Sequence, residues 1–236
     1  MKSILSLLQF TTILPVGKPK DLEDFARSSY LYPLAGYLIG GIAAIPVIFI
    51  ANPSVAAAVA IALLMLLTGA HHFDGLLDFG DGLMAHGDRE KRIRALTDRY
   101  IGAGGVGTGI SVTLLLFAGL QASHSILYLL IIGEVGAKFS MSFLTAYGKP
   151  FRTGIHSYLN GFSRPYFPFI ALLLCLPIIF LPVAPFKLAI AALIMIVSPT
   201  ILLIIADKLF GGVNGDVVGA SNEICRACIV IALAIL

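Results

Sequence analysis

The segment LAIAALIMIVSPTILLIIA, residues 188–206, decides the fold class of this protein. It contains no charged residue, and it approaches the roughly 20 apolar residues that a helix needs to cross a hydrocarbon core of about 30 Å. Similar runs lie at 31–50, 53–70, 106–123, 125–147, 166–184 and 217–236. The last run includes Asn222, Glu223 and Arg226, so its polar half must face protein or water. The pattern predicts about seven transmembrane helices.

The composition agrees with an all-α, polytopic membrane protein. Of the 236 residues, 58% are hydrophobic and 12% are charged, whereas about 25% are charged in soluble domains. The net charge of +3 is too small and too dispersed for nucleic acid to be the main partner. We expect one integral membrane domain over 1–236, surrounded by a lipid bilayer; the sequence leaves a homo-oligomer open. Residues 1–17, MKSILSLLQFTTILPVG, are predicted to form an interfacial helix and not a cleaved signal.

Lysine and arginine predict the orientation, because they are enriched on the cytoplasmic side of a membrane. They occur in three alternate segments, which contain Lys2, Lys18, Lys20 and Arg27, then Arg89, Lys91, Arg92, Arg94 and Arg99, then Lys149, Arg152 and Arg164. The connections on the opposite side contain only Lys187. The N-terminus is therefore expected in the cytoplasm, and the carboxylates gather at the same face. This predicts an active site on the cytoplasmic side of the cell membrane.

The most informative polar stretch is HHFDGLLDFGDG, residues 71–82, which follows the run at 53–70. If it is helical, Asp74, Asp78 and Asp81 share one face, because their spacing is i, i+4, i+7. Such carboxylates repel one another unless a cation lies between them, and hard oxygen donors suit Mg²⁺ or Mn²⁺. The alternative is a solvated helix face. His71 would lie on the aspartate face and His72 would point away, unless Gly75 breaks the helix.

A glycine-rich stretch, DRYIGAGGVG at 98–107, precedes the run at 106–123. No strand precedes it, so a dinucleotide-binding fold is not indicated. Its amides at a helix N-terminus, with Arg99, are nevertheless suited to a phosphate. Close helix packing is the alternative, and we expect it more at Gly107 and Gly109 than at 102–105.

Two further polar clusters complete the pattern. Glu134 and Lys138 lie four residues apart within the run at 125–147, where a structural ion pair is favoured over ligand binding. The late stretch GGVNGDVVGASNE, residues 211–223, again mixes glycine with oxygen ligands. A turn accounts for Asn214 and Gly215 but not for Asp216, Asn222 and Glu223. These three are predicted to complete the cytoplasmic pocket.

The stretches at 71–82, 98–107 and 211–223, in this order, resemble the cobalamin synthase family, the adenosylcobinamide-GDP ribazoletransferases. The similarity extends from TTILPVG through YPLAGYLIG to the chain end. It implies an Mg²⁺-dependent membrane phosphotransferase that joins adenosylcobinamide-GDP to α-ribazole or its 5′-phosphate and releases GMP. This is the last step of nucleotide-loop assembly in cobalamin biosynthesis.

The resemblance also selects residues. The family's His-x-Asp-Gly motif matches His72, Asp74 and Gly75, so the resemblance selects His72 where helix geometry selects His71. Candidate catalytic residues are His72, Asp81 and Asp98, and candidate metal ligands are Asp74, Asp78 and Asp81. Candidate substrate-binding residues are Arg99, Gly102, Gly104, Gly105, Asn214, Asp216, Asn222 and Glu223. One departure is Lys138, where the family pattern leads us to expect Arg.

Two alternative functions remain open. A CDP-alcohol phosphotransferase also places aspartates at helix ends, but it requires Asp-Gly-x-x-Ala-Arg where this chain has Asp-Gly-Leu-Leu-Asp. A secondary transporter would use Glu134 and Lys138 at the membrane midplane. The one-sided distribution of polar residues argues against it.

Overall fold

The structure is a computed structural model, and it describes residues 2–18, 21–123 and 125–236. Lys20, one of the cations used to predict the orientation, lies outside the described residues. The helices in chain order are α1 (Lys2–Thr11), α2 (Leu22–Ala26), η1 (Ser29–Leu31), α3 (Tyr32–Val47), α4 (Pro53–Leu67), α5 (His71–Met84), α6 (Arg89–Leu96), α7 (Ala103–Ala122), α8 (Ile126–Tyr147), α9 (Ile155–Phe162), α10 (Phe167–Cys175), η2 (Leu176–Phe180), α11 (Pro185–Phe210) and α12 (Gly215–Ile235).

The predicted class, a polytopic helical membrane protein, is confirmed. Among the described residues, five helical segments are long and apolar enough to cross a membrane: Ser29–Val47, α7, α8, α11 and α12. Two bent pairs raise the number to seven if each pair forms one span: α4 with α5, bent by 95°, and α9 with α10 and η2, bent by 93°. The predicted runs at 53–70 and 166–184 therefore correspond to only parts of broken spans.

The bend between α4 and α5 is built into the backbone. Gly69 and Ala70 both have positive φ, at 61° and 57°. A left-handed residue ends a helix, and glycine tolerates this conformation better than alanine does. The chain therefore turns sharply at these two residues, and the aspartates of α5 follow directly after the turn.

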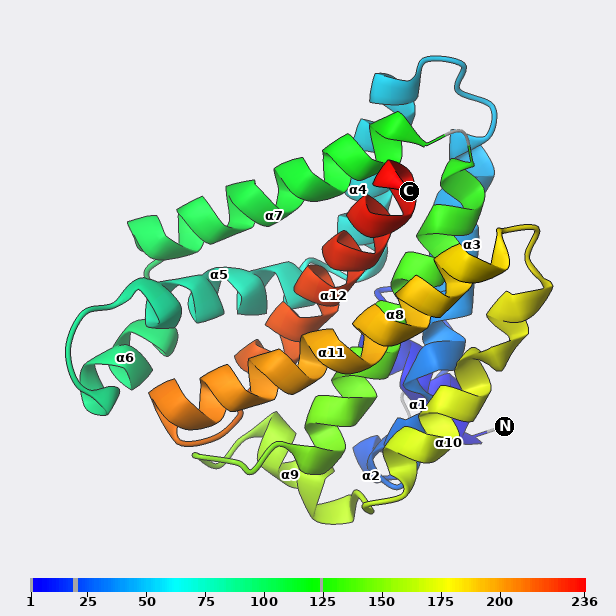
Figure 1. Cartoon of the computed structure of the whole chain (residues 1–236). Coiled ribbons are helices and arrows are strands. Elements are labelled where there is room, and N and C mark those ends of the chain that lie inside the picture. The colour runs from blue at the N-terminus through cyan, green and yellow to red at the C-terminus, as the bar shows by residue number, and fades with distance from the viewer. Residues whose placement is uncertain (1, 19–20, 124) are drawn as a thin grey trace.

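Helices α8 and α12 form the centre of the bundle. Within their membrane-spanning windows, 72% of the α8 residues and 67% of the α12 residues are buried, whereas the value for α11 is 22%. Figure 1 shows α12 running between α5 and α8, with α11 beside it. On α3, Gly36 and Gly40 allow a close approach to α8, since a Cβ on Gly36 would lie 2.7 Å from the Glu134 carbonyl oxygen. Small residues at such contacts let membrane helices pack backbone to backbone.

Residues 2–11 are helical, but the helix ends at Thr11, so residues 12–17 of the predicted N-terminal helix do not belong to it. Leu7 of α1 is fully buried, and the helix packs against α2 and α3. Its location at the membrane interface stays a prediction. The helix matters for function because its Phe10 ring stacks on Phe25, with centroids 4.7 Å apart, at the edge of the cavity described below.

Candidate active site

Helix α5 places the three aspartates as predicted. It is continuous from His71 to Met84 and Gly75 does not break it, so Asp74, Asp78 and Asp81 lie on one face. Asp74 is exposed, and the other two are half-buried. Their roles nevertheless differ, because the neighbouring helices approach them differently.

The Asp81 carboxylate binds the N-terminus of α7. Its Oδ2 accepts a hydrogen bond from the Gly102 amide at 2.7 Å, and its Oδ1 accepts one from the Gly105 amide at 2.8 Å. Helix N-termini have free N–H groups that stabilise an anion. Here the anion is a side chain of the protein, so the two amides predicted to bind phosphate already have a partner. Asp81 is positioned as a helix cap, and its assignment as a metal ligand stays a prediction.

The glycines of α7 pack against α5, contrary to the expectation for 102–105. A Cβ on Gly105 would lie 2.6 Å from the Leu77 carbonyl oxygen, and one on Gly104 would lie 2.8 Å from the Met84 Cβ. Gly109 is similarly close to Leu77, whereas Gly107 has open space around it. The close packing thus includes Gly104 and Gly105 as well as Gly109, and Gly107 is not part of it.

Helix α12 brings Asp216 to the aspartate face of α5. The two helices cross where Gly75 meets the backbone of Asp216 and Gly219 meets that of His72; a Cβ on Gly75 would lie 2.8 Å from the Asp216 carbonyl oxygen. Asn214 caps α12 by accepting from the Val217 amide at 3.1 Å and donates to Asp216 Oδ2 at 2.6 Å. Of the late polar residues, Asn214 and Asp216 therefore belong to this region.

Negative charge is concentrated at this crossing. The carboxylates of Asp216, Asp74 and Asp81 all repel the charge on Asp78, and Arg152 is the positive group that opposes them. Arg152 lies in the loop after α8, which pairs with the loop before α12: the Val213 amide donates to the Lys149 carbonyl at 2.8 Å. In the sequence, Arg152 contributes only to the predicted orientation of the protein in the membrane, and no local motif marks it as a site residue.

The donor chemistry of this cluster fits a divalent cation. Carboxylate oxygens at a site of surplus negative charge suit Mg²⁺ or Mn²⁺. In the described part of the chain, however, no three His, Cys, Asp or Glu side chains converge closely enough to hold an ion. Metal binding therefore stays a prediction, and Asp74, Asp78 and Asp216 are the groups best placed for it.

Asn222 and Glu223 lie elsewhere, in a buried network between α8 and α12. Lys138 Nζ donates to Asn222 Oδ1 at 2.6 Å and lies 3.5 Å from Glu134 Oε2. Arg226 pairs with Glu134 at 2.6 Å and also with Glu223. All five side chains are almost fully buried. The structural role expected for Glu134 and Lys138 thus extends to Asn222 and Glu223, which the structure does not bring to the aspartate cluster.

Asp98 and Arg99 lie at the surface. Asp98 Oδ1 accepts from the Tyr100 amide at 3.2 Å and so fixes the turn before α7, and Arg99 is exposed. Both precede Gly102, whose amide binds Asp81. They flank the aspartate face without contributing a buried group to it.

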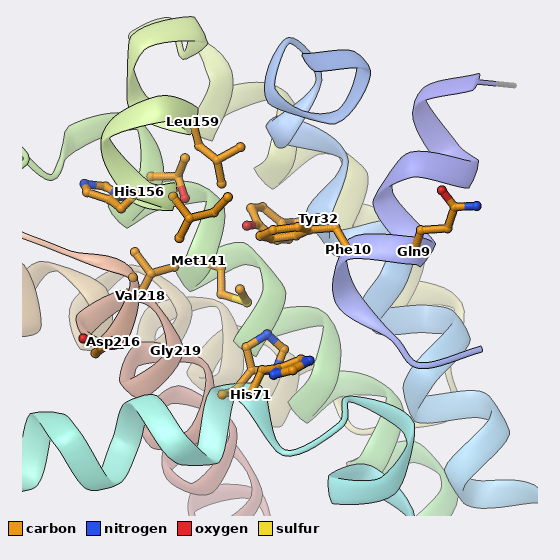
Figure 2. A pocket seen from close by; sticks show the side chains of 14 residues that line it. Gln9, Phe10, Tyr32, His71, Met141, His156, Leu159, Asp216, Val218 and Gly219 are labelled. Carbon is orange, nitrogen blue, oxygen red and sulfur yellow. The ribbon is translucent and has the colours of Figure 1, made fainter. Parts of the chain in front are cut away.

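The two adjacent histidines differ as helix geometry predicts. His71 is exposed on the aspartate side, and His72 is buried, with an Nδ1 atom that has no hydrogen-bond partner. Both nevertheless line one cavity of about 390 Å³, which adjoins the aspartate cluster through Asp216. Figure 2 shows this cavity between His156 and Leu159 of α9, Met141 of α8, Phe10 and Tyr32. The cavity is of a size that encloses a small organic ligand.

Comparison with known proteins now assigns the family. The family model for cobalamin-5-phosphate synthase matches residues 3–234. The chain belongs to this family. Relatives named adenosylcobinamide-GDP ribazoletransferase include those of Methanocella arvoryzae (35% identity over 96% of this chain and 92% of the relative) and Archaeoglobus fulgidus (34% over 100% and 98%). The protein of Methanococcoides burtonii is 33% identical over 96% of this chain and 89% of its own length. No solved structure gives a significant match.

The family assignment confirms the resemblance in the three polar stretches. Neither alternative, a CDP-alcohol phosphotransferase or a secondary transporter, is the family that matches.

Proposed function

We propose that this protein is an adenosylcobinamide-GDP ribazoletransferase. The main support for this proposal is the family match over residues 3–234, which is nearly the whole chain. The enzyme would join adenosylcobinamide-GDP to α-ribazole or its 5′-phosphate. A hydroxyl oxygen of the ribazole attacks the phosphorus that carries the cobinamide, the bond from this phosphorus to GMP breaks, and GMP leaves. The hydroxyl proton passes to a base on the protein.

The residues at the α5–α12 crossing can support each part of this reaction. Asp74, Asp78 and Asp216 would hold Mg²⁺, which supplies neutralisation of charge on the pyrophosphate when it is bound. Arg152, the cation beside these carboxylates, would orient the pyrophosphate by charge-assisted hydrogen bonds. The buried Nδ1 of His72, which has no partner, is our candidate to accept the hydroxyl proton.

We also propose that this site faces the cytoplasm of the cell. The support is the distribution of lysine and arginine, since those in the segments between the apolar runs, including Arg89 to Arg99 and Arg152, all fall on this side except Lys187. Substrates of this polarity are expected to arrive from the aqueous side and not through the hydrocarbon core.

One assay tests the activity. Purified protein in lipid vesicles is incubated with adenosylcobinamide-GDP, α-ribazole 5′-phosphate and Mg²⁺, and GMP and the cobalamin product are separated by chromatography. We expect both products in equal amounts, loss of both after EDTA treatment, and recovery with added Mg²⁺ or Mn²⁺. Failure to form GMP, while a relative such as the Archaeoglobus protein is active in the same assay, would refute the proposed activity. Undiminished turnover in EDTA would refute the metal requirement alone.

A further inference from the structure

The cavity beside the aspartate cluster has features that the proposed reaction leaves unexplained. It contains three of the five histidines of the chain: His71, His72 and His156. His156 is 3% exposed, and its Nε2 lies 2.9 Å from the Gly148 carbonyl oxygen. A carbonyl oxygen can only accept, so Nε2 carries the proton, and Nδ1 of the neutral ring is an acceptor. This Nδ1 is buried without a partner. Such an atom is costly unless a ligand supplies a donor.

The walls of the cavity are of two kinds. Figure 2 shows Phe10 and Tyr32 on the side of α1 and α3, with Met141 and Leu159 next to them, while His156 and Asp216 lie on the opposite side. The Tyr32 ring is fixed by an edge contact with Phe25, with centroids 5.0 Å apart. One side is thus mostly an aromatic and aliphatic wall, with Gln9 of α1 as a polar member beside Phe10, and the other carries polar groups next to the aspartate cluster.

We infer that this cavity binds the acceptor substrate, with the heteroaromatic base of a benzimidazole nucleoside against Phe10, Tyr32, Met141 and Leu159. The inference rests on the proposed function. The ribose lies on the polar side, where one hydroxyl donates to His156 Nδ1 and the reacting hydroxyl meets His72 and Asp216. His156 is then a residue that determines acceptor specificity, and no motif in the sequence identified it.

The size and polarity of the cavity indicate which part of the two substrates it can hold. A cavity of about 390 Å³ is in the range for a small organic ligand, and it is too small for a corrin macrocycle with its amide side chains. Guanine is small enough, but its amino and carbonyl groups would face Phe10, Met141 and Leu159 unpaired. A benzimidazole has no exocyclic polar group, and its π-face suits an aromatic wall. The acceptor base fits best, and the donor substrate approaches the aspartates from outside the cavity.

A protection experiment tests occupancy without relying on turnover. Ile155 at the cavity rim is 43% exposed, and Tyr158 on the same helix is 39% exposed but does not line the cavity. The variants Ile155→Cys and Tyr158→Cys are made in a Cys228→Ser background, since Cys228 is the exposed native cysteine. We expect α-ribazole to slow maleimide labelling of the Ile155→Cys variant at least about fivefold and to leave the Tyr158→Cys variant unchanged. Protection by GMP and not by α-ribazole would overturn the inference, and so would protection by neither.

A kinetic experiment tests the same cavity in the working enzyme. Leu159→Phe narrows it, and Leu172→Phe makes the same change in a separate apolar cavity between α10 and α11. We expect the KM for α-ribazole to rise about tenfold or more in Leu159→Phe, because hydrophobic pockets discriminate by such factors. The KM for adenosylcobinamide-GDP should stay within about twofold, and Leu172→Phe should change neither.

The outcomes separate this inference from the proposed activity. Wild-type turnover with an unchanged KM for α-ribazole in Leu159→Phe would overturn the acceptor site and leave the activity standing. Binding of α-ribazole to the cavity without release of GMP would refute the activity and support the site. If Leu159→Phe fails to fold, the labelling result decides, since it uses only substitutions at exposed positions.

Discussion

At the scale of single residues, the three aspartates of α5 have the same chemistry but different surroundings. Asp81 accepts two amide hydrogen bonds from the start of α7, whereas Asp74 is exposed. A carboxylate that caps a helix stabilises the fold, and an exposed carboxylate in a like-charged cluster is available for a ligand. Substitution to asparagine should therefore mainly lower the stability of the protein at Asp81 and mainly lower its turnover at Asp74.

We predict that Asp81→Asn destabilises the protein by about 1–3 kcal/mol, because the side-chain amide presents a donor to one of the two N–H groups. Asp74→Asn should change stability by less than about 0.5 kcal/mol and reduce turnover on the order of a hundredfold. Thermal unfolding in detergent and steady-state kinetics on the same samples measure both quantities. Full turnover in Asp74→Asn, or equal destabilisation by the two variants, would contradict this division of roles.

At the scale of elements, the crossing of α5 and α12 determines whether the site exists. Gly75 and Gly219 remove the side chains that would separate the helices, and Asp216 thereby reaches the aspartate face. About two turns beyond Asp216 along α12 begins the network with α8, in which Glu134, Glu223, Lys138 and Arg226 balance one another in charge. The first contact shapes the site, and the second holds the helix that supplies Asp216.

Gly75→Ala tests the crossing. The added Cβ would lie 2.8 Å from the Asp216 carbonyl oxygen, so α5 and α12 must move apart at a cost of about 1–3 kcal/mol. We expect turnover to fall at least about tenfold in protein that remains folded. Gly107→Ala is the matched control, because its Cβ would meet nothing within 4 Å, and it should behave as wild type. Equal kinetics in the two variants would mean that this close approach does not position the site.

Lys138→Met tests the network. Removal of one partner from a buried ion pair leaves an uncompensated charge, which typically costs about 3–5 kcal/mol. The double variant Glu134→Gln, Lys138→Met removes one charge of each sign and should recover much of the lost stability. The unfolding midpoint in detergent gives the comparison. A double variant less stable than Lys138→Met would show that the groups do not act as a charge-balanced set.

At the scale of the whole molecule, the orientation in the membrane can be measured directly. In a Cys228→Ser background, Gly87→Cys in the loop after α5 should react with a membrane-impermeant maleimide only from the cytoplasmic side. Ala51→Cys, in the loop between α3 and α4, should react only from the opposite side. Both positions are exposed. The reverse pattern would place the aspartate cluster outside the cell and refute the proposed orientation.

Local periodicity predicted much of this architecture. The apolar runs correspond to the membrane-spanning helices, and the spacing of Asp74, Asp78 and Asp81 gave their common face because α5 is continuous. Helix geometry also separates Asp216 from Glu223, since seven residues correspond to about 10 Å along a helix. The prediction that Asp216 and Glu223 complete the same pocket did not take this separation along the helix into account.

Other features depend on contacts between distant segments, which no local pattern contains. The Asp81 cap joins α5 to residues 21 and 24 positions later. Arg152 and His156 follow shortly after Lys149, whose carbonyl accepts a hydrogen bond from the distant Val213 amide before α12. The bend of 95° between α4 and α5, at Gly69 and Ala70, is likewise not contained in the apolar pattern of 53–70.

The arrangement of charges in the network has a consequence for biosynthesis. Glu134 and Lys138 are a pair within α8, and Glu223 and Arg226 are a pair within α12, so each helix can leave the translocon without net charge in its polar segment. Helix α8 is synthesised well before α12, the last helix in the chain. The pair within α8 lowers the free-energy cost of exposing these two charged side chains to lipid before α12 is inserted. When α12 arrives, Arg226 also binds Glu134. Glu134 thus has one basic partner, Lys138, before α12 is made and two once α12 has packed against α8.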